Sequence, residues 1–273
     1  MTAAGGSTGT AVVRALLARG ESVRAVVPSR RPRPELDGLG AEVVLGNLTG
    51  DLSGVFTGAD ALYLIWPNFD PAEATGAPAV LTAAARAGVP RLVYHSVLRP
   101  QARAMPHHAA KDRVEEALDG AVAGTAARWR VLQPCAYADN LDGQLAGAVA
   151  SGELPSPWGL EQAQSFVDLR DVADAAAVLL TEDGLDSGTF EAVGPEELTA
   201  PDVAALLSGH SGRPVTAVDV AATDDGSYAG RCRVAMFDWY RAHGFTGSPR
   251  VLTGLLGRPP RTYAEHLADL PTG

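Results

Sequence analysis

The sequence predicts an α/β fold built on a doubly wound parallel sheet, and three observations support this. A glycine-rich turn at residues 2–9 runs directly into a helical pattern. Short apolar runs then alternate with helical patterns over the first two-thirds of the chain. Two of these runs, 61–65 and 92–94, are apolar throughout, as parallel strands buried on both faces should be.

The predicted elements of this first part follow in chain order. Helix 10–19 places Val12, Val13, Leu16 and Leu17 on one face and ends at Gly20. Apolar runs bounded by turn residues predict the strands, and apolar residues at helical spacing predict the helices. The elements after the first helix are strands 22–27, 41–45 and 61–66, helix 77–87, strand 91–95, helix 108–118 and strand 129–132.

After residue 133 the pattern loosens. We expect a loop and helix in 136–151, a proline-rich turn in 152–158, and residues 166–172 opening helix 172–180. Strand 189–193, helix 200–208, strand 215–218 and helices 236–244 and 249–256 complete the chain. The sequence therefore predicts one larger domain, 1–150, and a smaller α/β substrate lobe, 151–273, that is interleaved with it.

Composition excludes several classes of function. The net charge of −10 argues against nucleic acid and against an anionic membrane surface as partners. The sequence has no apolar run near ~18 residues and no signal-peptide pattern. Two cysteines are too few for a disulfide framework. These observations favour a cytoplasmic protein, monomer or homodimer, that acts on a small molecule.

The glycine-rich turn favours dinucleotide binding. Glycines let the backbone approach a pyrophosphate, and the helix that follows offers free N–H groups. Ala3 stands in the place of the first glycine, which costs about 1 kcal/mol if its φ is positive. The alternative is a tight connection without a ligand. The residues expected to face the phosphates are Gly5, Gly6, Ser7, Thr8 and Gly9.

The stretch after the second strand distinguishes between cofactors. NAD sites place an acid there for the ribose 2′-hydroxyl, but the first acid here is Glu35. Arg30 and Arg31 suit a 2′-phosphate, so NADP(H) is favoured over NAD(H). The alternative is a solvated basic loop.

Several segments together resemble the NmrA-like, NAD(P)-binding branch of the atypical short-chain dehydrogenase/reductases. The resemblance implies a Rossmann domain with a C-terminal substrate lobe. It does not fix the reaction, because the family includes reductases, quinone oxidoreductases and cofactor-sensing regulators. The segments that carry it are Gly6-Ser7-Thr8-Gly9 with 12–20, and 93–101, 105–111, 132–137, 166–173 and 256–263.

The resemblance also implies binding residues at the carboxyl ends of the strands. Trp66, Pro67 and Asn68 would pass the adenosine ribose and nicotinamide, and Asn47 and Leu48 would border the adenine. The backbone near Pro134 would pass the nicotinamide, with Tyr137 and Asn140 lining the substrate space and Trp158 enclosing it. Simple packing is the alternative for the aromatic residues.

Ser96, His107 and Lys111 occupy the places of a Ser, Tyr and Lys that typical short-chain dehydrogenases use for catalysis. The spacing of four puts His107 and Lys111 on one helix face. A histidine in the tyrosine place puts Tyr-based chemistry in doubt, although His107 or His108 could supply a proton. Lys111 would hold the nicotinamide ribose. The alternative is an exposed helix start.

Other candidates have structural interpretations. Cys135 is expected to be a small buried thiol, and Asp168 and Asp171 to cap a helix or favour its dipole. No spacing predicts a metal site.

The strand that should precede the glycine-rich turn is missing, because Met1 stands directly before it. Such a strand lies at the centre of a doubly wound sheet, and its loss exposes apolar surface. We therefore expect a start upstream of Met1, with a truncated protein that binds cofactor weakly as the alternative.

Three functions remain open at this point. The first is an NADP(H)-dependent oxidoreductase acting on a small carbonyl or quinone-like acceptor. The second is a redox sensor that binds NADP(H) without turnover, and the third is a non-redox biosynthetic enzyme. His107 in the tyrosine place favours the last two, whereas Ser96 and Lys111 favour the first.

Overall fold

The structure is a computed structural model that describes residues 1–29, 31, 33–50 and 52–270. The chain divides into two compact units. The first contains Met1–Ala102, His107–Gln133 and Val172–Phe190. The second contains Arg103–Pro106, Pro134–Asp171 and Glu191–Gly273.

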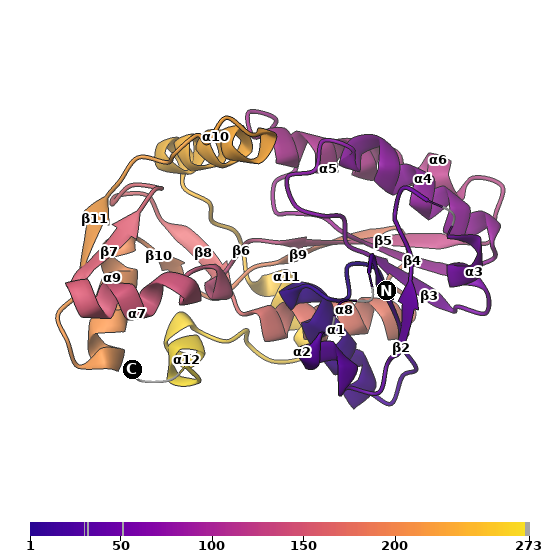
Figure 1. The fold of residues 1–273 in the computed structure, drawn as a ribbon, viewed down its shortest axis with the longest axis horizontal. Coiled ribbons are helices and arrows are strands. Elements are labelled where there is room, and N and C mark those ends of the chain that lie inside the picture. Colours follow the sequence, from indigo (N-terminus) through magenta and orange to yellow (C-terminus); the bar gives the residue numbers. More distant parts are fainter. Residues whose placement is uncertain (30, 32, 51, 271–273) are drawn as a thin grey trace. The chain divides into compact units, whose positions relative to one another are not determined.

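The first unit is built on parallel strands (Figure 1). β1 (Arg24–Val27) pairs in parallel with β2 (Glu42–Leu45). A second sheet has the order β3-β4-β5-β9, in which β3 pairs with β4 and β4 with β5 in parallel. Its strands are β3 (Ala61–Leu64), β4 (Arg91–His95), β5 (Arg128–Pro134) and β9 (Gly188–Ala192).

The first residues of the chain connect these two sheets. Val26 N donates to Met1 O at 2.8 Å, and Thr2 N donates to Tyr63 O at 3.1 Å. Ala4 N then donates to Val26 O at 3.3 Å. Met1 to Ala4 therefore run between β1 and β3 and pair with both. They lie where the strand expected before the glycine-rich turn would end.

Helices cover both faces of the strands, which confirms the predicted doubly wound α/β class. In Figure 1, α4, α5 and α6 lie on one face, and α1 and α8 lie on the other. The helices are α1 (Ser7–Ala18), α2 (Pro34–Asp37), α3 (Ser53–Phe56), α4 (Glu73–Arg86), α5 (Pro106–Glu116), α6 (Leu118–Val122) and α8 (Leu169–Thr181).

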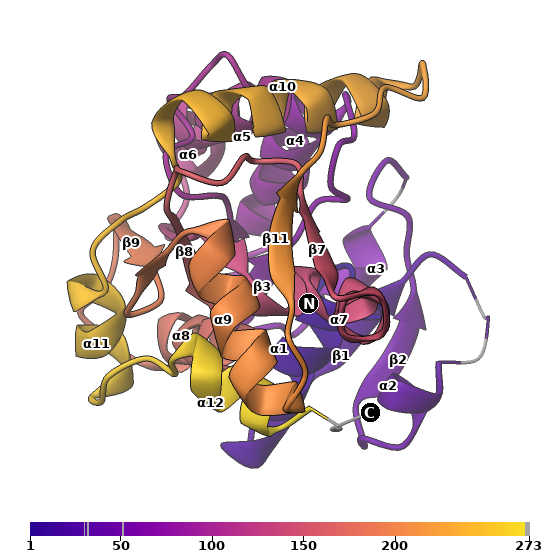
Figure 2. The same ribbon diagram turned by 90° about the vertical axis from the view of Figure 1, so that its left-hand side faces the viewer.

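The second unit contains two small sheets and further helices. In Figure 2, β7 lies beside β11, with α7 and α9 next to them. β7 (Glu153–Ser156) and β11 (Thr216–Asp219) are parallel, and the other sheet has the order β10-β8-β6. Its strands are β6 (Ala136–Tyr137), β8 (Gln164–Val167) and β10 (Glu197–Leu198). The helices are α7 (Asp142–Ser151), α9 (Ala200–Ser211), α10 (Tyr228–His243), α11 (Arg250–Leu256) and α12 (Tyr263–Ala268), with a 3₁₀ turn at Ala138–Asn140.

Two predictions for this second unit are wrong. The expected turn 152–158 contains strand β7, where Leu154 and Ser156 are buried and their neighbours are exposed. Pro155 is tolerated because β7 pairs on one side only, with β11. Phe166 and Val167 belong to strand β8 and not to the helix that follows.

Buried aspartates hold the start of α8 in the second unit. Asp168 Oδ1 accepts from Arg170 N at 2.8 Å, so Asp168 caps the helix as predicted. Asp171 is fully buried and accepts hydrogen bonds from the guanidinium groups of Arg258 and Arg261. Asp171 therefore ties the segment after α11 to α8.

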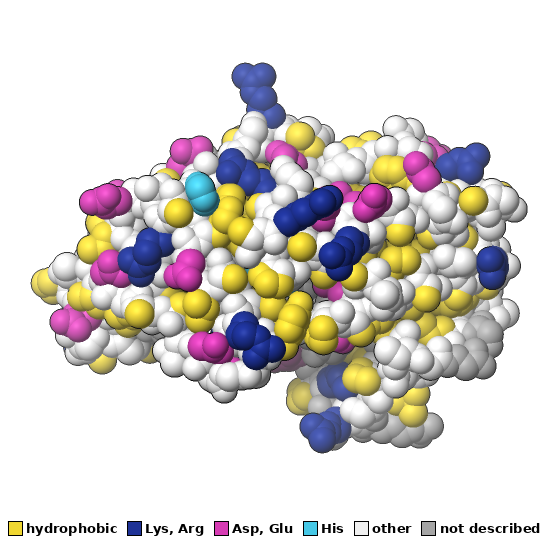
Figure 3. Space-filling view, turned by 90° about the horizontal axis from the view of Figure 1, so that it is seen from above, with side chains coloured by type: hydrophobic (Ala, Val, Ile, Leu, Met, Phe, Trp, Pro, Cys, Tyr) yellow, Lys and Arg dark blue, Asp and Glu magenta, His cyan; other side chains and the backbone are white. Residues whose placement is uncertain are grey.

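The described surface mixes charges of both signs. On the face drawn in Figure 3, Lys and Arg side chains are interspersed with Asp and Glu side chains. Within the described part of the chain, no helix is both long and apolar enough to span a bilayer.

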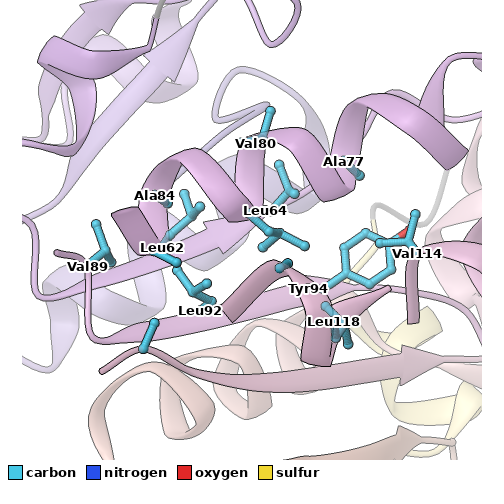
Figure 4. Packing of buried hydrophobic residues seen from close by; sticks show 14 of the residues in the cluster. Leu62, Leu64, Ala77, Val80, Ala84, Val89, Leu92, Tyr94, Val114 and Leu118 are labelled. Atoms are coloured by element: carbon cyan, nitrogen blue, oxygen red, sulfur yellow. The ribbon is translucent and has the colours of Figure 1, made fainter. Parts of the chain in front are cut away.

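One hydrophobic cluster of the first unit lies between the strands and α4, α5 and α6 (Figure 4). Apolar side chains of β3 and β4 meet one face of α4 there. Gly76 is required on α4, because a Cβ at that position would lie 2.2 Å from the Trp66 ring. The labelled members are Leu62, Leu64, Ala77, Val80, Ala84, Val89, Leu92, Tyr94, Val114 and Leu118.

Stability is expected to fall as pH rises from about 6.5 to 9 through His266. Burial lowers the pKa of His266, but hydrogen bonds to Asp168 (3.1 Å) and Asp142 (2.9 Å) outweigh it and raise the pKa to about 9. A folded-state pKa above the unfolded value stabilises the fold fully below about 6.5, and this stabilisation is lost as pH rises through 9. Urea unfolding at a series of pH values measures the slope. The variant His266→Gln should flatten it between those pH values, and an unchanged slope would exclude this histidine as the cause.

Candidate active site

The glycine-rich turn packs tightly against the start of α1. A Cβ on Gly9 would lie 2.2 Å from Ala3 O, so only glycine permits this approach. Gly6 is the N-cap residue and supplies no side-chain cap, and the first turn of α1 carries no acidic residue. The N–H groups at this helix start therefore suit an anion such as a phosphate.

Arg33 lies against this turn. A Cβ on Gly5 would lie 2.2 Å from Arg33 Nε, which shows how closely the guanidinium approaches. Arg33 Nη1 donates to Ser29 O and Arg31 O, both at 2.8 Å, and holds the loop after β1 in place. The sequence predicts Arg30 and Arg31 as the residues that bind the 2′-phosphate. Arg30 falls outside the described residues, and Arg31 is exposed.

The other predicted cofactor residues lie at strand ends of the first unit. Asn47 follows β2, and its Oδ1 accepts from Thr49 N at 3.2 Å. Trp66 is buried in the core, whereas Pro67 and Asn68 are exposed. Their contact with a cofactor, like that of the half-buried Leu48, stays a prediction.

Lys111 is buried and forms an ion pair. Its Nζ lies 2.7 Å from Glu73 Oε1, and Tyr94 Oη donates to the same oxygen at 2.8 Å. Lys111 Nζ also lies 3.4 Å from His95 O and 5.5 Å from the centre of the Tyr94 ring. The ammonium is neutralised locally by Glu73, a residue of α4 that sequence reasoning did not select.

Ser96 is held by a second acid, the half-buried Glu115. Its Oγ donates to Glu115 Oε1, and Gln133 Nε2 donates to both carboxylate oxygens of Glu115 at 2.9 Å. Burial raises the pKa of Glu115, although these hydrogen bonds oppose the shift. Ser96 and Lys111 therefore each have an acidic partner of their own.

His107 is a neutral, buried imidazole. Burial lowers its pKa to about 3, with smaller contributions from His108 and Lys111. Its ring meets Phe69 edge-on at 4.9 Å, and among the described residues its Nδ1 has no hydrogen-bond partner. The pKa of His108 is also lowered, to about 4, and its Nδ1 lies 3.0 Å from Arg99 O. The neutral ring of His107 can therefore form a hydrogen bond through Nδ1. Its protonated form is disfavoured at neutral pH.

The predicted substrate residues lie in the second unit. Tyr137 is half-buried on β6, and Asn140 is exposed at the end of the 3₁₀ turn. Pro134, which was predicted to pass the nicotinamide, is buried. Trp158 is buried with its ring centre 6.2 Å from that of Phe166. Cys135 is buried and burial raises its pKa to about 12, in agreement with an unreactive thiol.

Among the described residues, no set of three or more His, Cys, Asp or Glu side chains lies close enough together to bind a metal ion.

A comparison with protein families identifies the chain. The NmrA-like family matches residues 1–225, which is most of the sequence. The chain belongs to the NmrA-like family. The resemblance inferred from the sequence segments is thereby confirmed.

Three relatives illustrate what the chain is similar to. An NAD(P)H azoreductase of Xenophilus azovorans is 26% identical over 273 residues, covering 95% of this chain and 93% of the relative. A (4-alkanoyl-5-oxo-2,5-dihydrofuran-3-yl)methyl phosphate reductase of Streptomyces griseus is 32% identical over 194 residues, covering 68% and 65%. The NADPH complex of the quinone oxidoreductase QOR2 from Escherichia coli superimposes with a TM-score of 0.84 at 23% identity, covering 98% and 97%. These relatives support an NAD(P)H-dependent oxidoreductase of the family.

Replacing Ala3 by glycine is expected to stabilise the protein. Ala3 has φ +48°, in the left-handed region where a Cβ is strained. Ala3→Gly should raise the free energy of unfolding by about 1 kcal/mol. Chemical denaturation measures the change. The control Ala11→Gly, within helix α1, should lower it by about 1 kcal/mol. A loss of stability in Ala3→Gly would show that the turn is not strained.

Proposed function

We propose that this protein is an NADP(H)-dependent reductase that delivers hydride to a small conjugated acceptor of the quinone or azo type. The observation that carries the proposal is the Arg33 guanidinium lying against a glycine-rich turn at the start of α1. The named activities of the azoreductase and of QOR2 support it.

The residues present fit a dinucleotide. The close contact of Gly9 with Ala3 O holds the turn against the helix start. Gly6 N donates to Ala3 O at 3.1 Å, so the N–H groups of residues 7–9 are the ones that would bind a pyrophosphate. Arg33 would bind the 2′-phosphate, in place of the acid that selects the ribose hydroxyl in NAD sites. When bound, NADPH supplies a hydride.

The charge state of His107 favours acceptors that do not require a strong acid. With a pKa lowered to about 3 by burial, the His107 ring is neutral at pH 7. A quinone accepts hydride as a delocalised anion and can take its proton later from water, whereas an unconjugated ketone needs a proton as the hydride arrives. His107 would offer the acceptor a hydrogen bond from its neutral ring.

Lys111 and Ser96 would orient groups around the nicotinamide. The ion pair with Glu73 fixes the position of the Lys111 ammonium, and Glu115 fixes Ser96. Neither residue would have to change its charge. Their shared task would be to position the cofactor ribose.

The remaining assignments belong to the same proposal. Tyr137, Asn140 and Trp158 would line the substrate space, and Asn47, Leu48 and the 66–68 loop would border the cofactor. The protein would work in the cytoplasm as a monomer or homodimer.

Turnover of NADPH with a panel of quinones and azo dyes tests the function. Oxidation of NADPH should be observed with these acceptors and be slow with aliphatic ketones. His107→Phe keeps an aromatic ring against Phe69 but removes the nitrogens, so kcat should fall about tenfold or more. The control His243→Phe alters an exposed histidine of α10 and should not change the rate. Tight NADPH binding without turnover on any acceptor would favour the redox sensor instead.

Arg33 should determine the preference for NADPH. Arg33→Ala removes the guanidinium that would bind the 2′-phosphate, so Kd for NADPH should rise about tenfold to a hundredfold. Kd for NADH should change little, since NADH lacks that phosphate. Isothermal titration of both cofactors measures the two effects, with Arg86→Ala, at an exposed arginine of α4, as the control. An equal loss for both cofactors would contradict a role at the 2′-phosphate.

A further inference from the structure

The imidazole of His107 is covered by other side chains. Only 6% of the residue is exposed, and its Nδ1 atom is buried without a hydrogen-bond partner among the described residues. The rings of Phe69 and His108 pack edge-on against it, with ring centres 4.9 Å and 4.5 Å from its own. An acceptor that reaches His107 must therefore displace a group that covers it.

The His108 ring is the fixed one of these two rings. His108 follows His107 on α5 and is fully buried. Its Nδ1 lies 3.0 Å from Arg99 O. Moving this ring would break that contact and disturb the first turn of α5, so access to His107 depends on Phe69.

Phe69 lies on a short loop whose two ends are anchored. The loop joins β3 to α4 (Figure 1). On the β3 side, Thr2 Oγ1 donates to Ile65 O and accepts from Ile65 N, both at 2.9 Å. On the α4 side, Asp70 Oδ1 accepts from Ala72 N at 2.9 Å. The half-buried Phe69 stands between these anchors, so it can change conformation while β3 and α4 stay in place.

The backbone of Phe69 is strained. Its φ is +57°, in the left-handed region that is unfavourable for a bulky side chain. Asn68 Oδ1 accepts from Phe69 N at 3.1 Å and helps to hold this conformation. A rotation of φ to a negative value would relieve the strain and turn the phenyl ring in another direction. Relief of strain would thus offset part of the lost contact with His107, as expected of a residue with two conformations.

From these observations we propose that Phe69 is an aromatic gate over His107. Its ring and the ring of a flat conjugated acceptor compete for the same place against the imidazole, so Phe69 turns away when an acceptor enters. The acceptor then packs against His107 within reach of its unpartnered nitrogen. The inference rests on the proposed function, because that function assigns His107 to the acceptor site. It explains how a buried histidine meets a substrate and why a flat ring is preferred.

Fluorine NMR measures the movement of the ring directly. The protein is produced with para-fluorophenylalanine at its six phenylalanines, and the Phe69 signal is identified by its loss in Phe69→Leu. Duroquinone, added with NADP⁺ in place of NADPH so that no hydride is transferred, should shift the Phe69 signal. The signal of Phe190, a half-buried residue of β9 identified through Phe190→Leu, should not move. Cyclohexanone, whose ring is puckered and unconjugated, should shift neither signal.

Acylation of His107 by diethyl pyrocarbonate tests the cover itself. Phe69→Gly removes the ring at a backbone conformation that suits glycine, so His107 should be acylated about tenfold faster. Phe69→Leu keeps an apolar side chain there and should have a smaller effect. His243, exposed on α10, provides the control rate, which neither variant should change. Mass spectrometry of the modified peptides measures each rate.

These readouts separate the gate from the reaction. An unmoved Phe69 signal, or equal acylation of His107 with and without the phenyl ring, would overturn the gate. If duroquinone still oxidises NADPH in that case, the proposed function stands and only the gate is lost. A shifted Phe69 signal without any oxidation of NADPH would retain the gate and contradict the reductase.

Discussion

The hydrogen bonds of residues 1–4 are the constraint on which the rest of the first unit depends. Met1 and Ala4 pair with Val26, and Thr2 pairs with Tyr63, so four residues join β1 and β2 to the larger sheet. Thr2 Oγ1 adds bonds to Ile65 N and O, both at 2.9 Å. These bonds also fix the direction in which the chain enters the glycine-rich turn. The position of α1, and with it the helix start proposed to bind the pyrophosphate, follows from them.

This constraint explains the strain at Ala3. The chain must leave the sheet at Thr2 and bring its backbone against Gly9 within a few residues, which places Ala3 at φ +48°. Thr10 Oγ1, which donates to Ala4 O at 3.1 Å, holds the other side of the turn. The turn geometry is thus maintained by neighbouring contacts even though the residue at its centre is unfavourable there.

Much of the fold follows from the sequence because parallel strands buried on both faces have a distinctive pattern. The predicted strand 91–95 coincides with β4, and the family segments located the turn and helix start. β1 begins two residues later than predicted, at Arg24. β7 was missed because Pro155 reads as a turn signal, and a strand paired on one side only can accommodate it.

Site residues were harder to predict, since their roles depend on partners distant in the chain. The sequence shows a basic loop after β1, but only the fold shows that Arg33 is the arginine of this loop that lies against Gly5. Neither Glu73 nor Glu115 belongs to a recognisable sequence motif. They matter because the topology brings α4 to Lys111 and α5 to Ser96. An isolated glutamate on a helix gives no sequence signal that it will be buried beside a lysine.

The pairing of Lys111 with Glu73 gives a physical reason why histidine suits the tyrosine place. A lysine lowers the pKa of a nearby phenol by its uncompensated positive charge, and here a carboxylate 2.7 Å away cancels most of that charge. A tyrosine at 107 would therefore keep a high pKa and exchange protons poorly. A positive charge would be destabilising on His107, whose buried ring packs edge-on against both Phe69 and His108. A neutral imidazole fits that environment and still presents a hydrogen-bonding nitrogen. The histidine is therefore compatible with the buried ion pair, because neither places an uncompensated charge in this part of the core.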